Sequence, residues 1–229
     1  MDYQTWDPVY RRVLDDFGFP AAADERARDV LASLCEPFDR RRLPAFDGAH
    51  VAVCGGADTL ADELATVRQA DIVVAASVAA DTLREADIAV DLMVTDLDKN
   101  SDTARRLSRE GVVVAAHAHG DNIDAVRQHV PAFDGDHVLP TVQCAPVVPT
   151  ENFGGFTDGD RAAFLVDHFG ADELVFPGWA FDDPSVTEAK RRKLEWAERL
   201  LYWLEHRRGD RFSVLDGRRD AIDTSSLPI

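Results

Sequence analysis

The sequence predicts an α/β protein built on a mainly parallel sheet that is flanked by helices. From His50 onward, short runs rich in β-branched residues alternate with polar, Ala-rich segments of helical period, as in repeated strand–helix units. The runs are continuously apolar, as in strands that helices cover on both faces. The chain has 229 residues, 45% of them hydrophobic, enough to bury a full core. We expect an α/β domain over residues 49–208, an N-terminal helical segment over 1–48, and a C-terminal tail over 209–229 that frays from Gly217.

The N-terminal segment is predicted to form a pair of helices that leans on the main body. Two runs of apolar residues recur at helical spacing, and Gly18 and Pro20 separate them. The first run is Val9, Val13, Leu14 and Phe17, and the second is Ala27, Val30, Leu31 and Leu34.

Six strands are predicted in the domain that follows. In a parallel α/β sheet, ligands bind beyond the carboxyl ends of the strands, so the residues just after each strand are the first candidates for function. The clearest strands are Val51–Cys54, Ile72–Ala76, Leu92–Thr95, Val112–Ala116 and Leu174–Phe176, with a weaker one at Val138–Val142.

Two helix starts carry a sequence signal of their own. Thr157 with Asp160, and Ser185 with Glu188, have the spacing of a capping box, in which two side chains satisfy free backbone amides. The second start predicts a long final helix that runs to about His206.

The charge of the chain is unusual in its make-up. The formal charge is −17, carried by 31 Asp and 11 Glu against 22 Arg and only 3 Lys. Short carboxylates with few ammonium groups keep a surface hydrated where salt screens ordinary repulsion, so we interpret the chain as that of a salt-in halophile. Nucleic-acid binding is disfavoured because phosphate contacts need basic patches. Most Asp residues then serve solvation, and a single Asp says little about chemistry.

Neither a membrane segment nor a disulfide framework is predicted. No apolar run approaches the roughly 18 residues of a membrane span, and the first residues lack the features of a secretion signal. We therefore expect a cytoplasmic protein with no membrane partner. Cys35, Cys54 and Cys144 are too scattered for a zinc site or a set of disulfides.

A glycine turn follows the first predicted strand. Gly55 and Gly56 lead into a segment of helical period, where the free amides and dipole of a helix N-terminus can hold a phosphate. The turn lacks the full dinucleotide fingerprint and the Walker lysine. A phosphate loop and a plain tight turn therefore both remain open.

Two carboxylates follow the third predicted strand. In extended backbone, residues two apart project to the same side, so Asp96 and Asp98 are expected to project together beyond the sheet. Carboxylates about 4 Å apart repel by about 4 kcal/mol at an effective dielectric near 20, which favours a cation between them. Oxygen ligands alone point to Mg²⁺ or Mn²⁺. The alternative is a pair of solvated acids.

A third acidic residue follows the fourth strand. Asp121 either caps the next helix or joins Asp96 and Asp98 as a metal ligand at the same edge of the sheet. His117 and His119 stand just before it, but no third soft ligand lies nearby to complete a transition-metal site.

Two later segments can contact a ligand. Phe153 and Phe156 frame a Gly-Gly pair, where backbone can approach a flat ligand and a ring can stack on it; the alternative is a loop pinned to the core by the same rings. Lys190 and Lys193 lie on one side of the final helix, where they bind phosphate oxygens or form part of a solvated face.

In combination these motifs resemble the archaeal 6-hydroxymethyl-7,8-dihydropterin pyrophosphokinases, a family related in fold to thiamin pyrophosphokinases. The resemblance covers about residues 51–204. The motifs that carry it are VTDLDKN at 94–100, HAHGDN at 117–122, NFGGFTDGDRA at 152–162, and a DP pair followed by KRRKL within 183–194.

The resemblance implies a Mg²⁺-dependent transfer of the β,γ-diphosphate of ATP to the hydroxymethyl group of a reduced pterin, with release of AMP. On this reading the metal ligands are Asp96, Asp98 and Asp121, with His119 or a carboxylate taking the hydroxymethyl proton. Lys190 and Lys193 match a basic motif near the triphosphate, and we expect the glycine turn at Gly55 and Gly56 to bind ATP with them. The pterin is bound by Asn122, Asn152, Phe153, Gly154, Thr157 and Asp158.

Two other functions stay open at this point. An Asp-x-Asp after a strand also occurs in metal-dependent glycosyltransferases that use nucleotide sugars, and a non-catalytic nucleotide sensor would bind ATP without turnover. The oligomeric state is open as well, with a homodimer among the options.

Overall fold

The computed structural model describes all of residues 1–229 and confirms the predicted α/β class. Six strands form one sheet in the order β5-β4-β3-β2-β1-β6, and every neighbouring pair is parallel. All their carboxyl ends therefore meet at one edge. The strands are β1 (His50–Cys54), β2 (Ile72–Ala76), β3 (Leu92–Thr95), β4 (Val113–Ala118), β5 (Val138–Val142) and β6 (Glu173–Val175).

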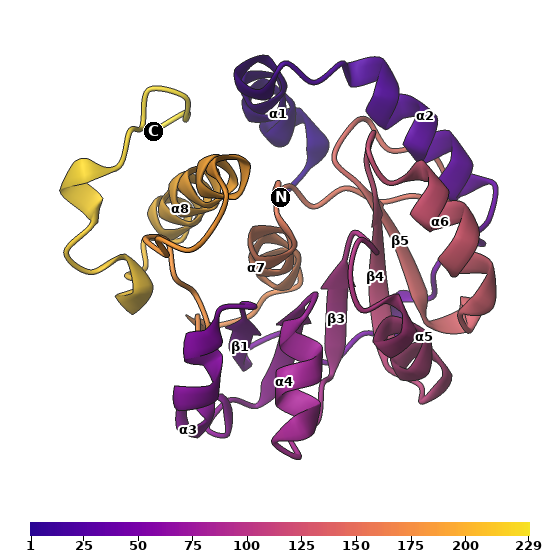
Figure 1. Ribbon diagram of the computed structural model, residues 1–229, viewed down its shortest axis with the longest axis horizontal. Coiled ribbons are helices and arrows are strands. Elements are labelled where there is room, and N and C mark those ends of the chain that lie inside the picture. The colour runs from indigo at the N-terminus through magenta and orange to yellow at the C-terminus, as the bar shows by residue number, and fades with distance from the viewer.

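Helices cover both faces of the sheet, as Figure 1 shows. On one side lie α3 (Leu64–Val67), α4 (Ala79–Glu85) and α5 (Ser101–Arg109). On the other, α7 (Asp158–His168) packs on β1, β2 and β3, and α8 (Glu188–Arg208) packs on α7. The first five strands are added in one direction and β6 returns to the side of β1, so a right-handed crossover places α7 on the opposite face.

The N-terminal helices share the core of the sheet. Helix α1 (Tyr3–Phe17) begins at Asp2, whose side chain accepts the Thr5 amide at 2.8 Å, and ends at Gly18, whose φ of 68° is left-handed. Helix α2 (Ala21–Ala32) packs on β4, β5 and α6 (Ile123–His129). Residues of both helices belong to the same buried hydrophobic cluster as the strands. The pair of helices predicted from apolar spacing is thus confirmed.

The predicted capping boxes have different outcomes. The box at Thr157 and Asp160 is confirmed and starts α7. The final helix begins two residues later than predicted, at the capping residue Thr187, whose hydroxyl accepts the amide of Lys190. Ser185 donates its hydroxyl to Asp183 instead, so it caps nothing.

The expectation that the tail frays from Gly217 is wrong. Leu227 is buried in the core. Arg218 forms ion pairs with Asp182 and Glu198, and Arg219 with Glu205. Tertiary pairs between arginines and carboxylates therefore hold a segment that its polar composition alone suggests to be loose.

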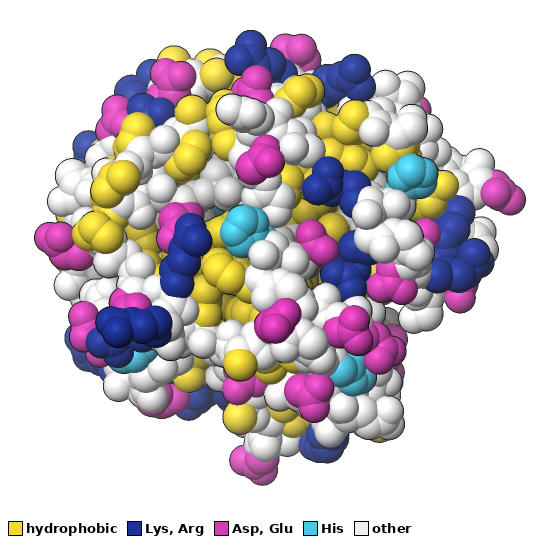
Figure 2. Space-filling view, turned by 180° about the vertical axis from the view of Figure 1, so that it is seen from behind, with side chains coloured by type: hydrophobic (Ala, Val, Ile, Leu, Met, Phe, Trp, Pro, Cys, Tyr) yellow, Lys and Arg dark blue, Asp and Glu magenta, His cyan; other side chains and the backbone are white.

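On the face shown in Figure 2, acidic and basic side chains are interspersed, and no broad basic patch is present. None of the helices has the length and apolar character needed to cross a membrane.

Candidate functional site

A cavity of about 580 Å³ opens at the carboxyl edge of the sheet. Residues from α2, α7 and α8 complete its walls. This is where a parallel α/β sheet binds its ligand. The segment after each of the six strands contributes to the lining, with Gly55, Ser77, Asp96, His119, Gln143 and Gly178 following β1 to β6 in turn.

The glycine turn after β1 packs closely against the loop after β6. The amides of Gly55 and Ala57 donate to carbonyls of the loop after β6, at 2.8 and 3.0 Å, and a Cβ on Gly55 would lie 2.4 Å from the carbonyl oxygen of Gly178. The predicted helix after the turn is absent: a 3₁₀ turn at Asp58–Asp62 and the four-residue α3 replace it. Gly55 and Gly56 also line the cavity, so phosphate binding at this tight turn stays a prediction.

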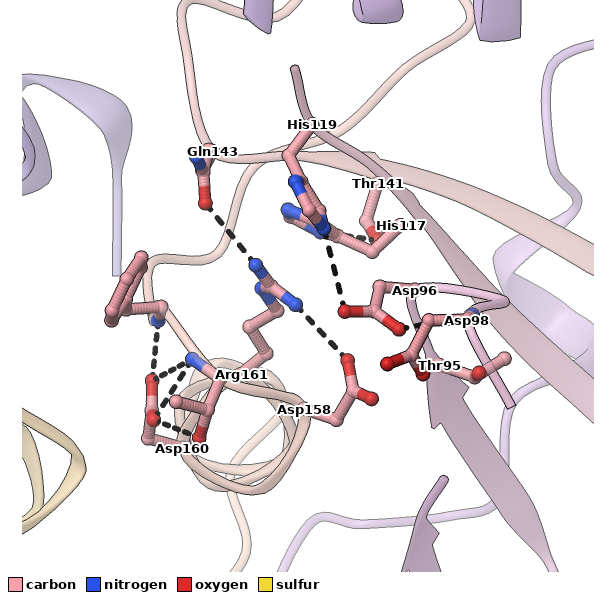
Figure 3. Close-up of polar contacts among 12 residues, drawn as sticks. Thr95, Asp96, Asp98, His117, His119, Thr141, Gln143, Asp158, Asp160 and Arg161 are labelled. Atoms are coloured by element: carbon pink, nitrogen blue, oxygen red, sulfur yellow. Dashed lines mark hydrogen bonds and ion pairs between the residues drawn. The ribbon is translucent and has the colours of Figure 1, made fainter. Parts of the chain in front are cut away.

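Asp96 and Asp98 come together as predicted, but a turn brings them there (Figure 3). Strand β3 ends at Thr95, and Leu97 has a left-handed φ of 66°. The amide of Leu97 donates to Thr95 Oγ1 at 3.0 Å, and the amide of Asp98 donates to Asp96 Oδ1 at 3.3 Å. Leu97 is 2% exposed, so its side chain anchors the turn in the core.

The two carboxylates differ in their electrostatics. Burial acts to raise the pKa of Asp96, but a hydrogen bond from His119 and the charge of Arg161 outweigh it and hold that pKa below the usual range. Burial and the neighbouring Asp96 raise the pKa of Asp98. A cation between the two carboxylates would relieve this repulsion.

The turn after β4 places its residues in different roles. His119 Nε2 lies 3.4 Å from Asp96 Oδ2, and the exposed Asp121 lines the cavity. Asn122 is buried and does not line it. Its Nδ2 donates to the carbonyl oxygens of Asp96 and His117 at 2.6 and 2.7 Å, and its Oδ1 accepts the amide of His119 at 2.9 Å. Asn122 therefore ties the ends of β3 and β4 together.

The predicted metal ligands do not form a closed cage. No three His, Cys, Asp or Glu side chains gather so as to hold a metal ion by themselves, and Asp121 is not clustered with Asp96 and Asp98. Mg²⁺ is commonly held by one or two carboxylates together with phosphate oxygens of a substrate. The adjacent pair fits Mg²⁺ bound in that way.

Arg161 is a site residue that the sequence reasoning missed. Its guanidinium lies between Asp158 Oδ1, at 3.0 Å, and Gln143 Oε1, at 3.1 Å, as Figure 3 shows. The side chains of Arg161 and Asp158 are 7% and 12% exposed. Burial, and then the charge of Asp96, raise the pKa of Asp158 to about 8, against the opposing charge of Arg161. The sequence signal for this pair was the spacing of Asp158 and Arg161, because an acid and a base three positions apart on a helix can form an ion pair.

The Asn152–Gly154 part of the predicted pterin loop lies outside the cavity lining. Asn152 donates its Nδ2 to the Cys144 carbonyl at 2.9 Å and accepts the Gly154 amide on Oδ1 at 2.8 Å. Phe153 is buried and packs on Phe169, at 5.4 Å between ring centroids. Asn152 and Phe153 therefore hold this part of the loop against the core, as in the second of the two interpretations of the sequence.

The other part of that loop does reach the cavity. Phe156, Thr157 and Asp158 line it. They stand where α7 begins, and the buried Asp160 holds the backbone there by accepting the amides of Phe156 and Thr157.

All three lysines of the chain, Lys99, Lys190 and Lys193, line this cavity. None of them forms an ion pair, whereas every ion pair of the protein uses Arg or His as its cation. Burial and the charge of Lys99 lower the pKa of Lys190. In a chain of net charge −17, three ammonium groups in one cavity, none with an ion-pair partner, indicate an anionic ligand.

Fold and cavity together define a class: a parallel α/β protein with a cavity at the carboxyl edge of its sheet, lined by a carboxylate pair and by lysines. The chain belongs to the family described as 6-hydroxymethylpterin diphosphokinase MptE-like, whose family model matches residues 29–185. The family resemblance drawn from the sequence motifs is thereby confirmed.

Three relatives carry the same name, 6-hydroxymethyl-7,8-dihydropterin pyrophosphokinase. The protein of Methanothermobacter thermautotrophicus is 36% identical over 92% of this chain and 97% of its own length. That of Pyrococcus furiosus is 34% identical over 90% and 95%, and that of Methanocaldococcus jannaschii is 29% identical over 90% and 96%. The similarity therefore spans nearly the whole of each protein.

Proposed function

We propose that this protein is a 6-hydroxymethyl-7,8-dihydropterin pyrophosphokinase, which transfers the β,γ-diphosphate of ATP to a reduced pterin and releases AMP. The hydroxymethyl oxygen attacks the β-phosphorus, and a new O–P bond forms as the bond from that phosphorus to the oxygen shared with the α-phosphate breaks. The electron pair leaves with AMP, and the hydroxymethyl proton passes to a base. One observation carries the proposal: a carboxylate pair and every lysine of the chain meet in one cavity, in a member of this family.

The phosphate end of the cavity neutralises charge. Lys99, Lys190 and Lys193 contact the oxygens of the triphosphate, because an ammonium group is a compact point charge suited to phosphate. Asp96 and Asp98 are the residues that would hold Mg²⁺, which would offset the negative charge of the triphosphate. Diphosphate transfer depends more on such positioning and charge stabilisation than on covalent help from the protein.

The acceptor end positions the pterin. Phe156 supplies an aromatic surface, and Thr157 and Asp158 supply polar groups at the start of α7. Arg161 fixes the orientation of Asp158. His119 lines the same cavity beside Asp96, and we assign it the removal of the hydroxymethyl proton.

Product analysis tests the proposal. Purified protein in molar KCl is incubated with Mg²⁺, ATP and 6-hydroxymethyl-7,8-dihydropterin, and AMP and the pterin diphosphate are quantified. We expect equal amounts of the two products and no AMP when the pterin is omitted. Release of a nucleoside diphosphate from a nucleotide sugar would instead identify a glycosyltransferase. ATP binding with no turnover of any acceptor would identify a sensor.

A further inference from the structure

The N-terminal segment forms one wall of the cavity. Phe19, Pro20, Ala23 and Asp24, from the turn between α1 and α2 and the start of α2, line it, although they lie outside the residues 29–185 that the family model matches. The contact is close: a Cβ on Gly120 would lie 2.6 Å from the Cβ of Ala23. Helix α2 therefore closes directly on the turn after β4.

Asp24 is a buried carboxylate on this wall. It is 4% exposed and has no ion-pair partner. Its Oδ2 accepts the hydroxyl of Tyr10 and Nε2 of Gln143, both at 2.8 Å, and its Oδ1 accepts the amide of Gly120 at 2.7 Å. Since each carboxylate oxygen can accept about two hydrogen bonds, Oδ1 keeps one acceptor position free.

The same carboxylate is held at the end of a rigid chain of polar side chains. Gln143 donates to Asp24 and accepts from Arg161, which in turn donates to Asp158. Asp24 and Asp158 are thus fixed relative to each other across one side of the cavity. A buried carboxylate costs free energy unless donors satisfy it, and a neutral side chain could join these elements at lower cost. The carboxylate on a ligand-facing wall therefore indicates a ligand that donates hydrogen bonds.

An apolar aromatic surface continues from Asp24 along the wall. The ring of Phe17 lies 5.2 Å from that of Phe19 and 5.1 Å from that of Phe156, measured between centroids, so Phe19 and Phe156 belong to one cluster. Both line the cavity. A flat ring with N–H donors on its rim fits a surface of this composition.

We infer that Asp24 is a specificity-determining residue of the acceptor subsite, whose Oδ1 accepts a hydrogen bond from the amino group or ring N–H of the pterin while the pterin ring lies against the Phe19–Phe156 surface. The inference rests on the proposed function. The 2-amino group and the N3–H of a pterin are on its pyrimidine ring, at the end of the bicyclic ring opposite the hydroxymethyl group. Anchoring that end at α2 leaves the reacting oxygen free to meet the triphosphate.

Kinetics with a matched pair of variants test the inference. Asp24→Asn changes the carboxylate of a residue that lines the cavity, whereas Tyr10→Phe removes a hydrogen bond to the same carboxylate from a residue that does not line it. We expect Asp24→Asn to raise the KM for the dihydropterin by roughly ten- to a hundredfold and to leave the KM for ATP unchanged. Tyr10→Phe lowers thermal stability and leaves both KM values unchanged.

A substrate analogue separates recognition from structural support. Wild type should have a higher kcat/KM for the dihydropterin than for an analogue that lacks the 2-amino group. In Asp24→Asn the ratio of these two kcat/KM values should be smaller than in wild type. If Asp24→Asn does not fold, as judged by circular dichroism, Phe19→Ala replaces it, with a several-fold rise in KM for the pterin alone.

The outcomes are distinct. A wild type without pterin-dependent AMP release overturns the proposed function and this inference with it. An active wild type combined with an unchanged pterin KM and analogue ratio in Asp24→Asn overturns the inference alone. Where Phe19→Ala stands in for that variant, an unchanged KM for the pterin has the same consequence.

Discussion

The contact between Arg161 and Asp158 should strengthen as the pH rises. Burial, followed by the charge of Asp96, raises the pKa of Asp158 to about 8, so its carboxyl is mostly protonated near pH 6.5 and mostly ionised near pH 9.5. Arg161 stays charged throughout. The hydrogen bond at 3.0 Å is therefore present at both pH values, but a full charge pair exists only at the higher one.

The sign and the size of the effect follow from this pKa. Because the pKa of Asp158 is higher in the folded protein than its unfolded value of about 3.9, its contribution to stability is complete below about pH 4 and is lost as the pH rises through about 8. Asp158→Asn should therefore gain stability relative to wild type towards pH 9.5.

The size of the change in coupling between Arg161 and Asp158 follows from Coulomb attraction. For charges about 4 Å apart at an effective dielectric of 20, the attraction is about 4 kcal/mol. With screening at a side chain that is 12% exposed, we expect the coupling free energy to rise by about 2 kcal/mol.

A double-mutant cycle measures that coupling. Urea unfolding of wild type, Arg161→Met, Asp158→Asn and the double variant is followed in metal-free buffer at both pH values. The control pair is Arg218 and Asp182, joined at 2.9 Å, where the hydrogen bond from Arg218 holds the pKa of Asp182 below its usual value. Its coupling should be the same at both pH values. Equal coupling at both pH values for the Arg161–Asp158 pair as well would refute the reasoning.

Three further predictions address the metal pair, the lysines and the salt response. Asp96→Asn or Asp98→Asn should abolish Mg²⁺-dependent turnover with the fold intact by circular dichroism; an unchanged rate at saturating Mg²⁺ would exclude the pair as the metal site. Lys193→Ala should raise the KM for ATP by about tenfold or more and leave that for the pterin unchanged, because a charge-assisted contact is lost. Arg191→Ala, on the same helix but outside the cavity lining and ion-paired only with Glu188, should change neither. Because the charge of −17 is carried mostly by Asp, thermal unfolding should occur at lower temperature in dilute buffer than in molar KCl, and equal midpoints would contradict the halophilic interpretation.

The sheet and its functional edge could be predicted because their signals are local. Continuously apolar runs predicted the six strands of the parallel sheet. Because such sheets bind ligands beyond the carboxyl ends of their strands, the position of the cavity could be predicted as well. Asp96 and Asp98 were found by an argument that assumed extended backbone, whereas the left-handed Leu97 brings them together. Alternation along a strand cannot reveal such a turn, because it depends on the burial of the Leu97 side chain.

Residues whose role depends on distant partners could not be predicted. Asn152 and Phe153 have the composition of a ligand-binding loop, but the Cys144 carbonyl and the ring of Phe169 draw them inward. Asp24 is held at the cavity wall by a hydrogen bond from Gln143, which is 119 positions away in the sequence. Pattern analysis reads neighbours along the chain, and these contacts exist only after the sheet has formed.

Lysine usage separates the structural cations of this protein from those that face its ligand. Arginine forms the ion pairs with carboxylates, where its planar guanidinium matches two oxygens at once. The chain has only three lysines, and all three line one cavity. An ammonium group meets phosphate oxygens from several directions, a geometry that the rigid fork of arginine does not reproduce. In a chain with 31 aspartates, the position of a single carboxylate says little about function. Lysine is rare in this chain, so the positions of its three lysines indicate the site most directly.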